Sequence, residues 1–449
     1  MIINDLKNKK IAVWGLGAEG KQIIAYLQKH ALSDKIILLN DTEVEKTQGC
    51  AAYELFIGEN IAKAFDNIDV IIRSPGVSIY KPEMAQAKQM GIQITSVTDL
   101  CLNEFLHRPN CKVIGVSGSK GKSSSVSILA YILRQMGYKV ALGGNIGKPM
   151  IELLDDEYDF VVEEFSSYQA SDLTASPQIA MFTNLYYVHT DWHNGHENYC
   201  LDKLHLIANQ KDGDVYFANA RNEQLLHYTE KYAKNRRWYD EKSGFHAEGK
   251  ELYYQDEKLL NIDELKIFGN HNLDNLSGVF SILEYLGIDI HQAAELAKSF
   301  EGLSHRLQKV AVKNGVMFIN DSISTAPEAA IGAVKSFAQN MVLISGGQDN
   351  MQDYRPYAEV LNDNPQVKMV ITLYQTGPKI AHAVREYTKR EDFELKETDS
   401  LEKAVAYAYD KLQKIGGGIV LFSPTSPSFG FYKNFMERGN HFIKIVEDL

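Results

Sequence analysis

One segment, residues 112–137, constrains the fold of this 449-residue chain more than any other. An apolar run predicts a buried strand, a glycine loop follows at 118–121, and an amphipathic stretch from Lys122 predicts a helix. Free N–H groups and the positive end of the helix dipole face such a loop, which makes it an anion cradle. We expect Lys122 to reach the terminal phosphates of a nucleotide and the Ser123 hydroxyl to hold Mg²⁺.

The loop differs from the standard phosphate-loop pattern, which places a glycine five residues before the Gly-Lys pair. That position is Val116 here, and the loop is the shorter stretch 118–123. A structural turn rich in glycine and serine is the alternative interpretation. The order of strand, loop, Lys-Ser and helix favours a phosphate site.

The bulk properties exclude several classes of protein. The length suggests about three domains, and the net charge, 47 − 58 = −11, does not suggest a nucleic-acid or membrane partner. The 4 cysteines have no paired or metal-type spacing, which is typical of reduced thiols. The first residues lack the apolar core of a signal peptide, and no apolar run is long enough to span a membrane. We therefore expect a cytoplasmic protein.

The first region, 1–98, contains a Gly-x-Gly-x-x-Gly fingerprint at 15–20 between a predicted strand and helix. Asp41 ends the next strand at the distance expected of a ribose-binding acid. By itself this domain indicates an NAD-dependent dehydrogenase, although the fingerprint serves any nucleotide diphosphate. A Ser-Pro-Gly turn at 74–76 follows a third strand, where open α/β sheets bind ligands. An ordinary turn is the alternative.

The central region, 99–305, has a second glycine-rich loop at 143–149, which suggests a wall of the same site. A strand from residue 160 ends in Glu163 and Glu164. An acid at the end of a strand beside a phosphate loop is the usual second ligand of Mg²⁺. Strand alternation places the two carboxylates on opposite faces, and composition does not say which one faces the site.

A histidine cluster follows at 188–196, with three histidines and one acid in eight residues from His189 to His196. These side chains could form a zinc site, but the spacing fits no common zinc signature. Its place after a strand suits Mg²⁺ or substrate contact better. Lys203 lies on a predicted helix, 198–209, and physical reasoning makes it a solvated surface residue.

The third region, 306–449, is a further α/β unit, with predicted strands at 309–312, 316–320, 341–345, 368–373 and 418–422. Polar residues follow the strands, at 321–325, 346–349 and 423–428. Three such units suit a ligand held between domains.

At this point the chain resembles the Mur ligase superfamily, the ATP-dependent amide-forming enzymes of peptidoglycan precursor synthesis. The resemblance spans essentially the whole chain and rests on 118–124, 143–147, 164–169, 189–191, His271, Asn272, Asn275, His305, Arg306, 320–322 and 423–428. Within the family, 166–169, 74–76 and 433–435 resemble the branch that adds glutamate to UDP-N-acetylmuramoyl-L-alanine.

The resemblance implies a three-domain α/β fold. It comprises a Rossmann-like UDP-binding domain, 1–98, a central P-loop ATPase-type domain for ATP and Mg²⁺, 99–305, and a Rossmann-like glutamate-binding domain, 306–449. It also implies an acyl-phosphate intermediate and the release of ADP and phosphate. Separately, we expect a monomer.

The resemblance further implies roles for individual residues. The expected catalytic residues are Lys122, Glu164, His189 and Lys203. The expected ATP contacts are Gly118, Ser119, Lys120, Gly121, Lys122, Ser123, Ser124, Asn275, Arg306 and Asp321. The UDP-muramoyl substrate is expected to contact Leu16, Asp41, Thr42, Ser74, Pro75, Gly76, Asn145, Ser166 and His189. Glutamate is expected at Thr325, Ser428, Phe429 and Phe435. The expected metal ligands are Ser123, Glu164, His189 and, if carbamylated, Lys203.

Two departures from the family pattern concern the acceptor. Ile323 replaces a lysine of the D-glutamate enzymes, and the stretch 346–350 lacks the lysine that follows Gly-Gly in the family. Loss of these positive charges should change how the two carboxylates of glutamate bind. This motivates the hypothesis that the acceptor is L-glutamate, whereas D-glutamate is the family default.

Three alternatives remain. A folylpolyglutamate-synthase-like ligase shares the last two domains but not the UDP loop. An NAD-dependent oxidoreductase has no use for the phosphate loop. In a non-catalytic nucleotide switch, Glu164 and the His189 cluster would have no function.

Overall fold

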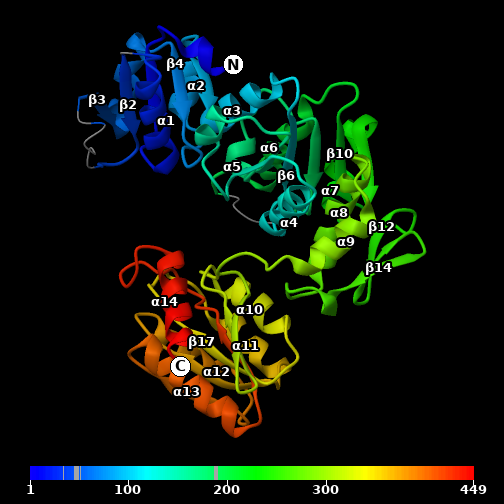
Figure 1. Ribbon diagram of the computed structural model, residues 1–449. Coiled ribbons are helices and arrows are strands. Elements are labelled where there is room, and N and C mark those ends of the chain that lie inside the picture. Colours follow the sequence, from blue (N-terminus) through cyan, green and yellow to red (C-terminus); the bar gives the residue numbers. More distant parts are fainter. Residues whose placement is uncertain (34, 45–49, 51, 187–190) are drawn as a thin grey trace. The chain divides into compact units, whose positions relative to one another are not determined.

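The computed structural model describes residues 1–33, 35–44, 50, 52–186 and 191–449. These residues form two compact units, which Figure 1 shows in sequence colours. The first unit contains 1–260 and 273–297, and the second contains 261–272 and 298–449. Within the described ranges, every helix is too short or too polar to cross a lipid bilayer.

The first sheet, in the first unit, has five parallel strands in the order β3-β2-β1-β4-β5. The strands are β1 (Ile11–Trp14), β2 (Ile36–Asn40), β3 (Glu54–Ile57), β4 (Val70–Arg73) and β5 (Gln93–Ser96). Its helices are α1 (Ala18–Lys29), α2 (Pro82–Gln89) and α3 (Val97–Leu106). Strand order reverses between β1 and β4, so a crevice opens at the carboxyl ends of these two strands.

The second sheet, also in the first unit, has six parallel strands in the order β11-β10-β9-β6-β8-β7. The strands are β6 (Lys112–Ser117), β7 (Val140–Gly144), β8 (Phe160–Glu164), β9 (Ile179–Phe182), β10 (Val215–Asn219) and β11 (Arg236–Tyr239). Because β6 lies between β8 and β9, the residues that follow these three strands meet at one edge.

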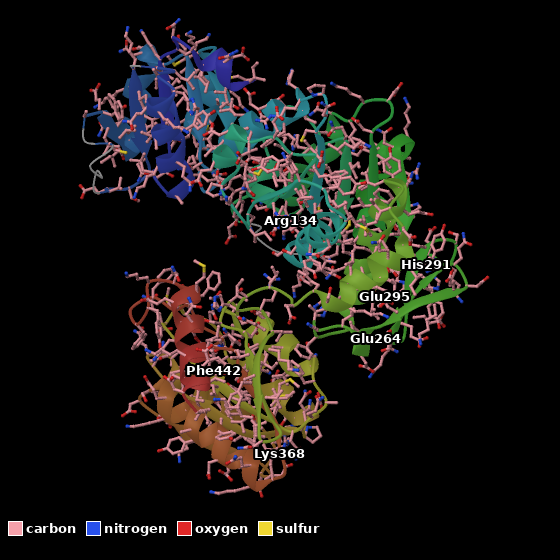
Figure 2. The ribbon with its side chains drawn as sticks, viewed as in Figure 1. Arg134, Glu264, His291, Glu295, Lys368 and Phe442 are labelled. Atoms are coloured by element: carbon pink, nitrogen blue, oxygen red, sulfur yellow. The ribbon has the colours of Figure 1, made fainter. Side chains whose placement is uncertain are left out.

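The helices of this part are α4 (Lys122–Gln135), α5 (Ser167–Ala170), α6 (His196–Ala208), α7 (Glu223–Tyr228), α8 (His271–Tyr285) and α9 (Ile290–Ser299). Arg134, labelled in Figure 2, ties the last turn of α4 to β7 by donating from Nη2 to the Val140 carbonyl, 2.9 Å away. A small sheet follows, with β12 (Phe245–Glu248) antiparallel to β13 (Glu251–Tyr254), and β14 (Glu257–Asn261).

The third sheet, in the second unit, has the order β15-β16-β20-β17-β18-β19. Its strands are β15 (Gln308–Lys313), β16 (Val316–Asn320), β17 (Met341–Ser345), β18 (Val367–Thr372), β19 (Glu394–Glu397) and β20 (Gly418–Phe422). β15 is antiparallel to β16, and the other described pairings are parallel.

Helices cover both faces of the third sheet, with a hydrophobic core on each. They are α10 (Pro327–Lys335), α11 (Arg355–Val360), α12 (Gly377–Tyr387), α13 (Leu401–Lys414) and α14 (Phe435–Glu447). Phe442 of α14, labelled in Figure 2, stacks on Phe422 of β20 with ring centroids 4.9 Å apart. The described residues also contain short 3₁₀ helices: η1 (Ile3–Leu6), η3 (Gly58–Asn67), η4 (Met150–Asp155), η5 (Glu230–Asn235), η6 (Ile262–Glu264) and η7 (Leu361–Asp363).

The predicted α/β class is confirmed, since the buried apolar runs form parallel strands. The strands that were not predicted from the sequence include β3, β19 and the run from β10 to β14. β3 and β19 are edge strands whose residues are exposed or half-buried, so they lack the continuous apolar run of a buried strand.

Candidate active site

The phosphate loop depends on two glycines with positive φ, Gly118 (140°) and Gly121 (90°). A Cβ on Gly118 would lie 2.0 Å from the Thr183 hydroxyl oxygen, and one on Gly121 would lie 2.2 Å from Oδ1 of Asn275. Larger residues therefore meet both backbone strain and a steric clash. The structure thus brings Asn275, predicted as an ATP contact, against the loop at the start of α4.

Two residues that follow β9, Thr183 and Asn184, hold this loop by hydrogen bonds. Neither was predicted from the sequence as a site residue. The N–H of Ser119 donates to the Asn184 carbonyl at 2.8 Å, and that of Lys120 donates to Oδ1 of Asn184 at 2.9 Å. The Thr183 hydroxyl donates to the Lys120 carbonyl at 2.6 Å. Their position in the sequence could have identified them, since polar residues after a buried parallel strand lie at the edge of the sheet where ligands bind.

Lys203 of α6 is buried beside the loop, 2% exposed, so its interpretation as a surface residue was wrong. Its ammonium donates to the Gly118 carbonyl at 2.9 Å and to the Ser117 hydroxyl at 3.4 Å. Burial, and then the nearby charge of Lys122, lower the pKa of Lys203 well below its usual value, while Glu164 acts in the opposite direction. A lowered pKa makes the neutral amine more accessible, and this is the form that would react with carbon dioxide to give a carbamate.

The two strand-end acids of β8 differ in their surroundings. Glu164 accepts from the Asn145 amide at 3.0 Å through Oε1, while its buried Oε2 has no hydrogen-bond partner among the described residues. Glu163 is fully buried, and burial followed by the charge of Glu19 raises its pKa well above the usual range. Since Glu164 is the acid that acts on Lys203, it is the one on the phosphate-loop side.

These oxygen donors fit a magnesium ion. Ser123 is buried in the first turn of α4, and Glu164 contributes a carboxylate oxygen without a protein partner in the described ranges. Mg²⁺ is held by one or two such oxygens together with waters and substrate phosphates. When bound, it would neutralise charge that develops on the phosphates.

The histidine cluster does not converge in the described residues. His193 is buried, with Nδ1 2.5 Å from Asp202 and Nε2 2.9 Å from the Ser167 hydroxyl. His196 instead faces Gln224, at 3.4 Å. Within the described ranges, no group of three His, Cys, Asp or Glu side chains is placed to hold a metal. His189, the predicted metal and substrate residue, lies outside the described residues.

The predicted UDP contacts of the first region lie at the carboxyl edge of the first sheet. The Ser74 hydroxyl donates to the Gly15 carbonyl at 2.7 Å, which joins the Ser-Pro-Gly turn to the glycine loop. The Leu16 N–H donates to the Asn40 side chain at 3.1 Å. Asp41 accepts from the Trp14 indole at 3.1 Å, and Thr42 is exposed. Ser166, from the second sheet, accepts from the Gln169 N–H as the N-cap of α5.

In the second unit, the predicted residues follow β16 and β20. Asp321 accepts from the hydroxyls of Ser324 at 2.5 Å and Ser423 at 2.8 Å, and burial raises its pKa to about 6 despite these bonds. The Thr325 carbonyl accepts from Gln352 at 3.1 Å. Ser428 is buried, Phe429 is 57% exposed, and Phe435 begins α14. The roles of these residues and of Arg306 stay predictions.

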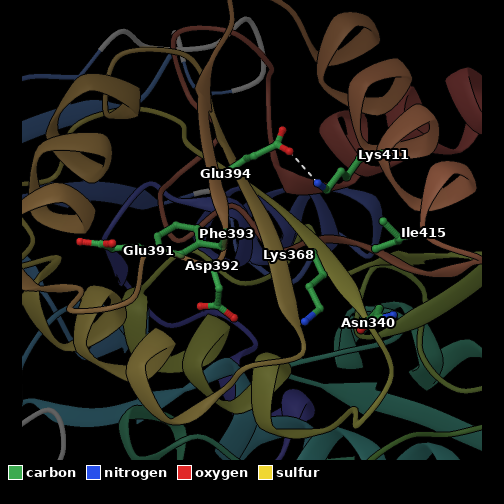
Figure 3. A pocket seen from close by; sticks show the side chains of 8 residues that line it. All are labelled: Asn340, Lys368, Glu391, Asp392, Phe393, Glu394, Lys411 and Ile415. Atoms are coloured by element: carbon green, nitrogen blue, oxygen red, sulfur yellow. Dashed lines mark hydrogen bonds and ion pairs between the residues drawn. The ribbon is translucent and has the colours of Figure 1, made fainter.

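A pocket of 320 Å³ in the second unit lies away from these residues (Figure 3). Asn340 and Lys368 line it at the amino-terminal ends of β17 and β18, and Lys411 pairs with Glu394 across it at 2.6 Å. The predicted glutamate residues follow the carboxyl ends of strands in the same sheet. The pocket is therefore not the predicted glutamate site.

The fold and the site define an α/β nucleotide-binding protein with a phosphate loop, a strand-end glutamate and a buried lysine in one unit. The model of the Mur ligase middle domain matches residues 116–283, and that of the MurD-like N-terminal domain matches 9–96. The chain is 31% identical to the UDP-N-acetylmuramoyl-L-alanine–L-glutamate ligase of Xanthomonas axonopodis pv. citri, over 99% of this chain and 97% of that protein. The chain belongs to the Mur ligase family.

Two further comparisons bear on specificity and fold. The UDP-N-acetylmuramoylalanine–D-glutamate ligase of Clostridium botulinum is also 31% identical, over 99% of this chain and 98% of that protein. The crystal structure of the MurF ligase of Thermotoga maritima in complex with ADP shares 15% identity at a TM-score of 0.56, covering 99% of this chain and 97% of that one. The structural likeness supports the fold.

Proposed function

We propose that this protein uses ATP to ligate glutamate to UDP-N-acetylmuramoyl-L-alanine, a step of peptidoglycan precursor synthesis, with release of ADP and phosphate. The observation that carries this proposal is the surroundings of the phosphate loop. Lys122 donates to the Ser119 carbonyl at 3.2 Å, and the buried Lys203 donates to the Gly118 carbonyl at 2.9 Å. Glu164, at the end of the neighbouring strand, has a carboxylate oxygen without a partner among the described residues. The names of the relatives and the ADP complex of a MurF ligase support it.

The chemistry follows from the weakness of a carboxylate as an acyl donor. The γ-phosphoryl group is first transferred to the alanine carboxylate, which yields an acyl phosphate. The glutamate amine then attacks the acyl carbon, and phosphate leaves. Lys122 and the N–H groups at the start of α4 neutralise charge on the phosphates, while the protein holds the reactants in position and excludes water.

We retain the three-domain division, 1–98, 99–305 and 306–449, as part of this proposal. The UDP end is assigned to the crevice between the glycine loop and the Ser74 turn, because both lie at the switch point of the first sheet. Glutamate is assigned to the carboxyl edge of the third sheet. We also propose Mg²⁺ as cofactor, a carbamylated Lys203, and a monomer that works in the cytoplasm.

We further propose L-glutamate as the acceptor. Ile323 lies in the stretch after β16, where its N–H donates to the His305 carbonyl at 3.1 Å. A hydrocarbon at this position supplies no charge to a glutamate carboxylate, in contrast to the lysine of the D-glutamate enzymes. The relatives named for L- and D-glutamate are both 31% identical to this chain, so overall identity does not separate the two acceptors.

Phosphate release with ATP and Mg²⁺ tests both proposals. We expect release only when UDP-N-acetylmuramoyl-L-alanine and glutamate are both present, and faster release with the L-enantiomer. Release without the UDP substrate would contradict the ligase assignment. Turnover with D-glutamate only would contradict the L-glutamate assignment and leave the ligase assignment intact.

A further inference from the structure

Arg73, the last residue of β4, is fully buried and faces the Ser-Pro-Gly turn that follows it. Its Nη1 donates to the carbonyl oxygens of two turn residues, Ser74 at 3.3 Å and Pro75 at 3.3 Å, and to that of Val77, which follows the turn, at 2.9 Å. A buried guanidinium requires such partners, because an unpaired buried charge is costly. The turn is therefore shaped around this side chain.

The remaining carbonyl of the turn is held from another direction. The Trp192 indole N–H donates to the Gly76 carbonyl at 3.2 Å, and the Arg73 guanidinium lies over the Trp192 ring, 5.7 Å from its centroid. In a trans peptide the C=O and N–H groups point in opposite directions. Since the Pro75 carbonyl points to Arg73, the Gly76 N–H points away from it, on an exposed residue where it can meet an anion.

The other nitrogens of Arg73 bind the segment 166–172, which directly follows the strand of Glu164. Nη2 donates to the Tyr168 carbonyl at 2.9 Å and the Ser171 hydroxyl at 3.2 Å, and Nε donates to Asp172 at 2.8 Å. Asp172 also accepts from Ser96, at the end of β5, at 3.3 Å. One guanidinium thus joins the first sheet to the segment that continues the magnesium-side strand.

We propose that Arg73 is a positioning residue that seats the 74–76 turn against segment 166–172, and so places the bound UDP-muramoyl substrate relative to the phosphate loop. This inference rests on the proposed function, because it assigns the turn to that substrate. Arg73 acts through the turn: it orients the Gly76 N–H and fixes its distance from the Glu164 strand. Lysine cannot replace it, since the acceptors are spread around a planar guanidinium with five N–H groups, whereas an ammonium has three N–H groups on one nitrogen.

The test measures binding of UDP-N-acetylmuramoyl-L-alanine and of ATP separately, by calorimetry, in Arg73→Lys and Asp172→Asn. For Arg73→Lys we expect Kd for the UDP substrate to rise about ten- to a hundredfold, as for lost hydrogen bonds to a charged group, with Kd for ATP within about twofold. Asp172→Asn leaves the guanidinium on the turn and removes the charge partner, so a smaller rise in the same Kd is expected.

Asp99→Asn is the matched control, because Asp99 binds Thr174, two residues beyond the segment 166–172, and none of its described hydrogen bonds goes to the turn. Its carboxylate accepts from the Thr174 N–H at 2.7 Å and from the Thr174 hydroxyl at 2.8 Å. We expect this variant to lower Tm and leave both Kd values unchanged. If Arg73→Lys or another Arg73 variant does not fold, Asp172→Asn carries the test.

Two results would overturn the inference alone. One is a normal Kd for the UDP substrate in both variants despite a lowered Tm, as in Asp99→Asn. The other is an equal loss of affinity for ATP and the UDP substrate. Wild-type protein that binds ATP but not the UDP substrate would instead overturn the proposed function and, with it, this inference.

Discussion

The ammonium group of Lys203 lies 2.9 Å from the carbonyl oxygen of Gly118, so helix α6 and the phosphate loop are joined by a buried amine. Lys122 directly follows the same loop as the first residue of α4, and its charge helps to lower the pKa of Lys203. Two like charges in a buried site cannot both be retained without cost. Burial beside Lys122 therefore disfavours a positive charge at residue 203.

Lys203→Met tests whether that group takes part in turnover. We expect phosphate release to fall by roughly a hundredfold, the scale of losing a group that organises a metal site, while the protein stays folded because methionine matches the buried stem. Wild-type activity should also fall in bicarbonate-depleted buffer and recover when bicarbonate is restored. Near-normal turnover of Lys203→Met would exclude a carbamate at this position.

Lys122→Ala tests the separation of the ATP and UDP sites. We expect kcat to drop by about 10²–10³-fold, as when one fixed electrostatic donor is removed from a transition state. Calorimetric binding of UDP-N-acetylmuramoyl-L-alanine should stay unchanged, because that substrate is assigned to the first sheet. Loss of this binding in Lys122→Ala would argue against separate sites.

Gly121→Ala tests the shape of the phosphate loop. Its Cβ would lie 2.2 Å from Oδ1 of Asn275, and φ is +90°, so both clash and strain are expected. Gly137→Ala is the control, because Gly137 has φ +92° and nothing within 4 Å of the added Cβ. We expect both variants to lose about 1–2 kcal/mol of stability from the left-handed backbone. Only Gly121→Ala should raise the KM for ATP, by about tenfold or more; equal KM values would show that the contact is irrelevant to ATP.

Asp274, one residue before Asn275, gives the first unit a pH-dependent stability. Burial and the neighbouring Asp240 raise its pKa to about 6, which Arg221 opposes. Because this folded-state pKa exceeds the unfolded value of 3.8, the contribution is present below pH 4 and is lost as pH rises through 6. The side chain is 44% exposed, so after solvent screening we expect a loss of about 1 kcal/mol.

Asp274→Asn should remove this pH dependence, since the amide can donate to Asp240 at any pH. The measurement is urea unfolding by tryptophan fluorescence at pH 5 and pH 8; all 3 tryptophans lie in the first unit. The variant should gain more stability relative to wild type at pH 8 than at pH 5, where the wild-type carboxyl is still mostly protonated in the folded state. The same difference at both values would rule out this carboxyl pair as the cause.

The phosphate loop and the strand-end acids were predictable because their signals are contiguous. A strand, a glycine loop and a helix start are defined by neighbouring residues, so Gly118, Lys122 and Ser123 were recognisable together. Likewise, the alternation of β8 places Glu163 and Glu164 on opposite faces whatever surrounds the strand. Alternation does not specify which face of the strand is directed to the site, so these residues by themselves did not reveal which acid faces the loop.

Long-range packing decided the rest. Lys203 is far from the loop in sequence, and only the packing of α6 beside β6 buries it and lowers its pKa. The sequence around Arg73 shows only a residue at the end of a strand. Its role depends on its hydrogen bonds to Tyr168 and Asp172, which are distant in the chain. Neighbouring residues thus determined the class of protein and the phosphate-binding chemistry, since loop and helix-start hydrogen bonds form within a few positions. The tertiary structure determined which charges are buried and paired, because burial and charge pairing depend on residues distant in the chain.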